Sequence, residues 1–203
     1  MDEKRLLAIM AHPDDESMGV GGALARYAVE GAGVYLITAT RGQLGWFGDE
    51  ASYPGPQILG AIREQELYAA ARILGLREVH LLDYMDGALD QAQPSRIIAQ
   101  LVTHIRRIRP QVVLTFDPNG YYGHPDHIAV SHWTVLAFQQ ATAPGRDGPR
   151  LLYYMAVPAS LQQALGLNQL SAIDDAAITL AVDVLPVWER KLAAIRCHRT
   201  QLG

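Results

Sequence analysis

The sequence predicts an α/β fold built on a mainly parallel sheet, and three observations lead to this class. Short runs of aliphatic and β-branched residues alternate with segments of helical period along all 203 residues. Most of these runs are apolar throughout, as strands covered by helices on both faces require. No internal repeat or linker divides the chain, and its length suits one hydrophobic core, so we expect a single domain over residues 1–203.

Each expected strand is a short apolar run, and each expected helix is a longer segment with an apolar face. In chain order, the strands are expected at residues 6–10, 34–39, 79–82, 112–116 and 151–157, with a further short one at 178–182. Helices are expected at residues 21–30, 62–74, 95–107, 127–139 and 186–198. Residues 41–60, with five glycines and two prolines, and residues 141–150 are expected to be loops.

Two helix boundaries follow from local chemistry. Ser95 comes after Pro94 and before an apolar-periodic run, so it is expected to cap the amino end of a helix. Gly75 follows Leu74 and can adopt the left-handed conformation that ends a helix. These residues are therefore assigned to structure and not to a site.

Charge and hydropathy argue against several classes of protein. The formal net charge is −4, so the chain offers no basic field for nucleic acid or an anionic membrane. The apolar run at residues 6–11 is far shorter than the roughly 18 residues of a spanning helix, so we expect no signal peptide and no membrane anchor. Cys197 is the only cysteine, which fits a reducing compartment, and we expect a cytoplasmic protein.

The first motif with recognisable chemistry is AHPDDE at residues 11–16, directly after the first expected strand. Ligands of open α/β sheets bind at the carboxyl edge of the strands, where this motif must lie. Pro13 restricts the turn that presents His12 and the acids. The acids could instead cap the following helix, whose amino end favours anions, but capping does not explain a histidine at the strand exit.

The second motif, YGHPDH at residues 122–127, repeats this design after the strand expected at 112–116. Two His-Pro-Asp turns at one sheet edge can gather imidazoles and carboxylates around a metal ion. A catalytic zinc site commonly has three nitrogen or oxygen ligands, which His12, Asp15 and His127 would supply. Fe²⁺ or another divalent transition ion is the alternative, because these ligands do not select one metal.

The strings AHPDDE and HPDH, in this order, resemble the signature motifs of the PIG-L/LmbE-like deacetylases, and the resemblance covers nearly the whole chain. Weaker matches lie at Thr40-Arg41-Gly42 with Gly45, Arg63-Glu64-x-Glu66, Lys191, His198 and Gln201. The resemblance implies a Rossmann-like α/β fold. It also implies a zinc-dependent hydrolase that removes an N-acetyl group from an N-acetylglucosamine-type glycoconjugate or thiol-glycoside, and it is compatible with a homo-oligomer.

The resemblance also implies roles for single residues. By match of motif, His12, Asp15 and His127 are metal ligands, Asp14 is the general base, and His124 stabilises or protonates the intermediate. A metal ion can lower the pKa of bound water from about 15.7 to about 7, and a well-placed base adds roughly a hundred- to ten-thousand-fold. These roles agree with the chemistry of amide hydrolysis.

Four further residues have expected roles in the same site. Asp126 could hold a protonated His124 as its carboxylate partner, and Tyr122 is a mobile companion by resemblance. Arg63 is expected to contact substrate or acetate, with helical pairing to Glu66 as the alternative. Asp86 is expected to contact sugar hydroxyls, with turn formation as the alternative.

Two other functions compete with the hydrolase. A nucleotide-binding Rossmann module is suggested by Gly19-Val20-Gly21-Gly22, but Leu24 stands where the fingerprint needs its third glycine. A non-catalytic metal-binding protein would leave Asp14 and His124 without a task. The aromatic residues Trp46, Phe47 and Tyr53 could stack on a sugar or pack a lid or an interface.

Overall fold

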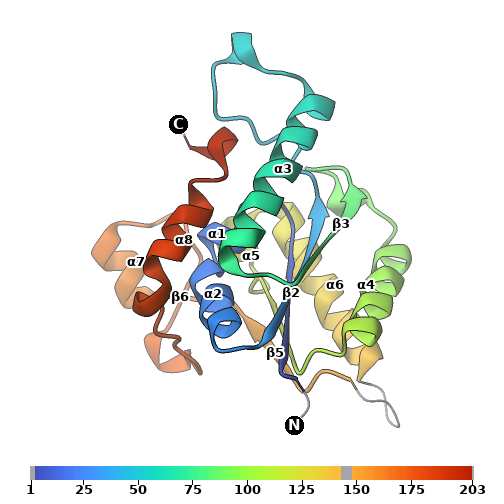
Figure 1. The fold of residues 1–203 in the computed structure, drawn as a ribbon, viewed down its shortest axis with the longest axis vertical. Coiled ribbons are helices and arrows are strands. Elements are labelled where there is room, and N and C mark those ends of the chain that lie inside the picture. The colour runs from blue at the N-terminus through green and yellow to red at the C-terminus, as the bar shows by residue number, and fades with distance from the viewer. Residues whose placement is uncertain (1–2, 143–147, 203) are drawn as a thin grey trace.

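The computed structural model describes residues 3–142 and 148–202. Its centre is a five-stranded parallel sheet in the order β3-β2-β1-β4-β5 (Figure 1). The strands are β1 Arg5–Met10, β2 Gly33–Thr40, β3 Glu78–Tyr84, β4 Val112–Thr115 and β5 Leu151–Tyr154. Strand order reverses between β1 and β4, so a crevice opens at their carboxyl ends, as in Rossmann-like folds. The predicted fold class is confirmed.

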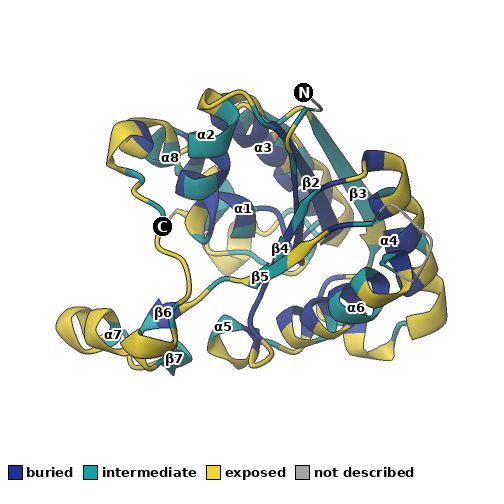
Figure 2. Ribbon diagram, turned by 90° about the horizontal axis from the view of Figure 1, so that it is seen from below, coloured by how far each residue is buried: buried dark blue, intermediate teal, exposed yellow. Residues whose placement is uncertain are grey.

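Helices cover both faces of the sheet because its central strands are apolar on both sides. Every residue of β2 is buried, as are Leu6–Met10 of β1. The helices α2 Gly21–Val29, α3 Pro56–Leu74 and α8 Trp188–Ile195 pack together on one face. The helices α4 Pro94–Ile108 and α6 Pro125–Ala141 pack together on the other face, and Figure 2 shows the buried sides of both layers turned toward the sheet.

Several predicted helix boundaries were wrong because proline, and not serine, sets where a helix begins. Pro94 occupies the first turn of α4, so Ser95 is inside the helix and does not cap it. Pro56 likewise begins α3, so the loop predicted for residues 41–60 ends at Gly55. Gly75, with a φ of 81°, ends α3 in the left-handed conformation as predicted. Of the loop predicted at 141–150, residues 143–147 lie outside the described part of the chain.

The strand predicted at residues 178–182 was wrong. These residues are irregular, and a two-stranded parallel sheet forms instead from β6 Val157–Pro158 and β7 Ala172–Ile173. β6 is also separate from β5, so the strand predicted at residues 151–157 ends early. An apolar run becomes a strand only where a neighbouring strand can accept its backbone hydrogen bonds, and sequence alone does not place that neighbour.

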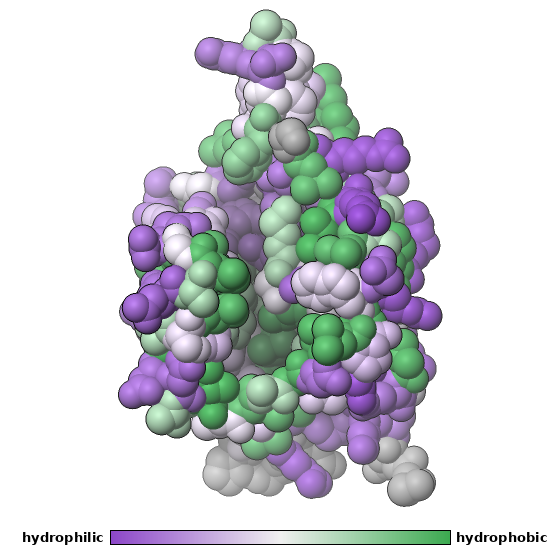
Figure 3. Space-filling model, turned by 90° about the vertical axis from the view of Figure 1, so that its left-hand side faces the viewer, coloured by the Kyte–Doolittle hydropathy of each residue, from purple (hydrophilic) through white to green (hydrophobic). Residues whose placement is uncertain are grey.

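The remaining helices are short. The helices α1 Asp15–Met18 and α5 Gly120–Gly123 follow β1 and β4, and α7 Ala159–Leu165 lies beside the small sheet, away from the main body in Figure 2. The 3₁₀ helices are η1 Glu50–Ser52, η2 Leu89–Gln91, η3 Asp175–Ala177, η4 Leu185–Val187 and η5 Arg199–Gln201. The face seen in Figure 3 is hollowed near its centre, with hydrophobic residues around the hollow. Among the described residues, no helix is long and apolar enough to cross a membrane.

Candidate active site

The two His-Pro-Asp motifs meet where the strand order reverses. AHPDDE leaves β1 directly, and HPDH begins α6 shortly after β4, the strand paired with β1. His12 and His127, 115 residues apart in sequence, therefore face one another with Nδ1 and Nε2 at 3.3 Å. The carboxyl edge of the sheet brings together the groups that the sequence predicted there.

His12, Asp15 and His127 are spaced as ligands of one metal ion would be. His12 Nδ1 and His127 Nε2 are 3.3 Å apart. Asp15 Oδ1 lies 3.4 Å from His127 Nε2, and Asp15 Oδ2 lies 3.6 Å from His12 Nδ1. Ligands bound tetrahedrally at about 2.0–2.1 Å are roughly 3.3–3.4 Å from one another. A ring of two imidazole nitrogens and a carboxylate at this spacing fits a divalent transition ion.

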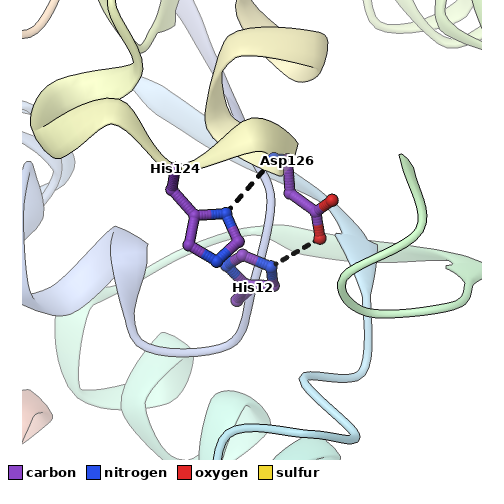
Figure 4. Close-up of side chains that lie close together, drawn as sticks. All are labelled: His12, His124 and Asp126. Carbon is purple, nitrogen blue, oxygen red and sulfur yellow. Dashed lines mark hydrogen bonds and ion pairs between the residues drawn. The ribbon is translucent and has the colours of Figure 1, made fainter. Parts of the chain in front are cut away.

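Carboxylates on the far side of His12 orient its ring. His12 Nε2 lies 3.0 Å from Asp126 Oδ2, drawn in Figure 4, and 3.0 Å from Asp86 Oδ1. In the neutral ring, these contacts favour the proton on Nε2 and leave the Nδ1 lone pair facing the other ligands, as in carboxylate–histidine–metal arrangements. Burial lowers the pKa of His12, but the bonds to Asp126 and Asp86 and the charge of Asp15 raise it to about 10. In the metal-free protein the His12 ring is therefore protonated at neutral pH, and a metal ion bound at Nδ1 would replace one proton.

Asp126 does not hold His124 in the way we expected. Its fully buried carboxylate accepts hydrogen bonds from the backbone N–H groups of Gly87 and Leu89, in addition to its contact with His12. Its own backbone N–H donates to His124 Nδ1 at 3.2 Å, as Figure 4 shows. Because Asp126 lies in the first turn of α6, its N–H faces the N-cap residue while its carboxylate reaches the turn after β3.

His124 is arranged as a neutral hydrogen-bond donor. Because Nδ1 accepts a hydrogen bond from Asp126, the proton of a neutral ring is assigned to Nε2. Burial, followed by the charge of His12, lowers the pKa of His124 and favours this neutral form. The Tyr122 ring lies edge-on to His124, and burial together with nearby acids raises its pKa to about 12. Both side chains can therefore donate a hydrogen bond at neutral pH.

Asp14 combines a strained backbone with a carboxyl group of raised pKa. Its φ of 118° and ψ of −32° lie outside the regions that residues with side chains prefer, at a cost of about 1–3 kcal/mol. Burial, and then the charge of Asp15, raises its pKa to about 7, although Arg63 opposes the shift. The Asp14 side chain makes no capping bond to α1 within the described structure, so capping does not account for it.

Arg63 is turned toward the protein and not toward open solvent. Only 2% of its surface is exposed, and its guanidinium donates to the carbonyls of Gly42 and Pro13 and to Asp14 Oδ2. The Gly42 backbone has a φ of 65°, and a Cβ there would lie 2.3 Å from Arg63 Nη1, so this position requires glycine. The geometry thus places Arg63 beside Asp14, where it lines the pocket and bonds to the turn.

The structure also bears on two alternatives, the pairing of Arg63 with Glu66 and a purely turn-forming role for Asp86. Glu66 accepts hydrogen bonds from Thr200 N–H and Oγ1, so it serves a different segment from Arg63. Asp86 is 6% exposed, accepts from the Leu44 N–H and contacts His12, so it does more than shape a turn.

A cavity of about 520 Å³ opens over these groups, a size suited to a small ligand. Its lining includes Gln201, which in the sequence was only a weak family match without a role. It also includes side chains that sequence reasoning missed, among them Met18, Leu44, Phe116 and Met155. These residues carry no local signal, because their place at the pocket depends on contacts between distant segments. Of the three loop aromatics, Phe47 lines the cavity, while Trp46 and Tyr53 lie 6.2 Å apart.

Comparison with known proteins supplies the family. A model described as PIG-L, GlcNAc-PI de-N-acetylase, matches residues 7–138. The 1D-myo-inositol 2-acetamido-2-deoxy-alpha-D-glucopyranoside deacetylase of Thermobifida fusca is 33% identical, over 100% of this chain and 85% of its own length. The N,N'-diacetylchitobiose deacetylase of Pyrococcus horikoshii has a TM-score of 0.74 at 26% identity, over 100% and 72% of the two chains.

The same fold also occurs with a different reaction. The 4-carboxy-2-hydroxymuconate hydratase of Pseudomonas putida has a TM-score of 0.76 at 24% identity, over 96% of this chain and 78% of its own. That likeness concerns the fold alone, whereas the family match and the Thermobifida relative extend to the sequence. The chain therefore belongs to the PIG-L (GlcNAc-PI de-N-acetylase) family.

Proposed function

We propose that this chain is a metal-dependent N-deacetylase that hydrolyses the N-acetyl amide of an N-acetylglucosamine-type glycoside or thiol-glycoside. The observation that carries the proposal is the ring of His12, Asp15 and His127, with atoms 3.3–3.6 Å apart. Two members of this ring, His12 and Asp15, line one cavity together with Asp14 and His124. The deacetylases among its relatives support the same reaction class. The fold alone would not, because a hydratase shares it.

His12, Asp15 and His127 would hold Zn²⁺, or Fe²⁺ as the alternative, with His12 binding through Nδ1 and His127 through Nε2. When bound, the ion would lower the pKa of water and polarise the acetyl carbonyl. The two imidazoles bind as neutral rings, and the contact of His12 Nε2 with Asp126 and Asp86 favours the required tautomer.

Asp14 and His124 would act on two sides of the amide: Asp14 would transfer the proton, and His124 would stabilise the negative charge on the carbonyl oxygen. Asp14 takes a proton from the attacking water and returns it to the leaving nitrogen as the C–N bond breaks, so the products are acetate and a free amine. His124 Nε2–H donates to the carbonyl oxygen as negative charge develops there. Tyr122 is 47% exposed beside His124, where a substrate could cover it, and Asp86 lines the same cavity for contact with sugar hydroxyls.

We further propose that residues 1–203 act as one deacetylase domain in the cytoplasm. Both motifs contribute to one cavity, and Gln201, near the end of the chain, lines it too. The single thiol, Cys197, is compatible with a reducing compartment. The nucleotide-binding alternative loses its support, because a Cβ on Gly22 would lie 2.7 Å from Val184, so this glycine permits close packing.

The test measures acetate release from N-acetylglucosaminides whose aglycones are methyl, inositol, malate or a second sugar. Chelator-treated protein should be inactive, and Zn²⁺ or Fe²⁺ should restore turnover at about one ion per chain. The matching glucosaminides, which lack the acetyl group, serve as blanks. Metal-loaded protein that releases acetate from none of these substrates would contradict the proposal and favour a non-catalytic metal-binding role.

A further inference from the structure

Both ends of one peptide bond in the active site are held by buried side chains. The Pro13 carbonyl accepts from Arg63, and the Asp14 N–H of the same peptide donates to Glu16 Oε2 at 3.0 Å. This peptide leads into the strained backbone of Asp14, with its φ of 118°. A residue keeps such a conformation only where its surroundings hold it there. Glu16, like Arg63, is therefore a side chain that holds the backbone leading to the Asp14 carboxylate.

The second oxygen of Glu16 is held from the other end of the chain. Glu16 Oε1 lies 2.7 Å from His198 Nε2 and accepts from Ser17 Oγ at 2.5 Å. All three side chains have no exposed surface. A buried carboxylate is tolerated only when it is paired and hydrogen-bonded, so Glu16 depends on these partners. His198 Nδ1 has no partner within the described structure, so Nε2 is the nitrogen that carries the contact.

The segment that carries His198 also touches α3, and that contact offers an internal comparison. Thr200, two residues later, donates from N–H and Oγ1 to Glu66. The bonds of His198 and Thr200 both anchor the same C-terminal turn to buried or partly buried acids. Only the His198 bond leads through Glu16 to the Asp14 peptide. A role in stability and a role in placing Asp14 can thus be separated.

We propose that Glu16 and His198 form a positioning pair: His198 orients the Glu16 carboxylate, and Glu16 holds the Asp14 N–H. Both side chains are fully buried, and neither lines the cavity. The pair acts on the reaction by setting the distance and direction at which Asp14 meets the attacking water. This inference rests on the proposed function, since it concerns the base of that reaction.

The test compares two amide side chains that differ by one methylene group. The amide nitrogen of Gln can lie where His Nε2 lies, whereas that of Asn lies near Nδ1, which has no partner. His198→Gln should keep kcat within about 3-fold of wild type. His198→Asn should lower kcat about 10- to 100-fold, because a misplacement of roughly 1 Å can cost that much. Its KM should stay within about 2-fold, and its zinc content should be unchanged.

Thr200→Val is the matched control. It removes the Oγ1 bond to Glu66 from the same turn, and also the bond that Oγ1 accepts from Gln201 Nε2, which keeps its bond to the Gly45 carbonyl. It should therefore lower the melting temperature and leave kcat within about 2-fold of wild type. Equal kcat values for His198→Gln and His198→Asn would overturn the positioning pair. A loss of kcat in Thr200→Val in proportion to its melting temperature would also do so, since stability would then explain both.

A further variant keeps the test decisive if His198→Asn does not fold. Ser17→Ala removes the 2.5 Å bond to the same Glu16 oxygen and should lower kcat several-fold at constant KM, whereas an unchanged kcat would count against the pair. Wild-type protein that releases no acetate contradicts the proposed function, and the role of the pair with it. If the wild type is active and the variants have the same kcat as the wild type, only the role of the pair is contradicted.

Discussion

Replacing Asp14 by asparagine removes a proton acceptor and leaves the rest of the site nearly unchanged. Asparagine has almost the same size, tolerates a positive φ, and keeps an oxygen for Arg63 Nη2, which lies 3.1 Å from Asp14 Oδ2. Zinc binding and folding should therefore be preserved. Loss of a general base lowers kcat about 10²- to 10⁴-fold, or roughly 2.7–5.4 kcal/mol at about 1.36 kcal/mol per tenfold.

The assay follows acetate release at saturating substrate, with zinc content measured on the same samples. Asp14→Ala is the comparison variant: it also lacks the base, but alanine fits the φ of 118° poorly, so it should lose stability as well. An Asp14→Asn enzyme with full zinc occupancy and more than about a tenth of wild-type kcat would refute the assignment of Asp14 as the base.

The pH dependence of kcat/KM is a second test of Asp14 as the base. Burial, and then the charge of Asp15, raises the pKa of Asp14 to about 7 in the metal-free protein, and a bound dication favours the ionised form and lowers that pKa. Because a base acts when ionised, kcat/KM of the metal-loaded enzyme should fall as pH drops through this lowered value. Asp14→Asn should lack this acidic limb. A wild-type limb that persists in the variant would assign it to another group.

Three further predictions concern the metal and the buried polar contacts. His127→Ala should abolish zinc binding and acetate release. In calorimetry, zinc at 100 times its Kd should stabilise the folded wild-type protein by about 2.7 kcal/mol and raise its Tm by roughly 5–11 °C, whereas the Tm of His127→Ala should not respond to zinc. Asp126→Asn should weaken zinc binding about 10- to 100-fold in a chelator competition, since the carboxylate orients His12; unchanged affinity would contradict this. Although burial lowers the pKa of His198, its bond to Glu16 raises it overall, so this contribution to stability is present below pH 6.5 and is lost as pH rises through the folded-state pKa. The urea midpoint of wild type should therefore fall more between pH 6 and pH 10 than that of His198→Gln.

Local chemistry was enough to predict most of the sheet. Apolar runs such as Leu6–Met10 are long enough for a strand and too short for most helices, and their burial on both sides indicates a parallel sheet between helices. The wrong boundaries lie where tertiary contacts decide. Residues 178–182 have the composition of a strand but no ladder, and Pro56 begins α3 within a glycine-rich stretch that reads as a loop.

For the site, the sequence by itself determined which chemical groups are available and which sheet edge presents them. His12 and Asp15 must leave β1 together, because the turn that carries them is contiguous with the strand. Which partner each group meets was decided only by the tertiary structure. The carboxylate of Asp126 faces His12 and not His124, two residues away, because the first turn of α6 directs it toward the turn after β3. The contact between Glu16 and His198, 182 residues apart, likewise depends on α8 packing beside α1 and leaves no periodic pattern in the sequence.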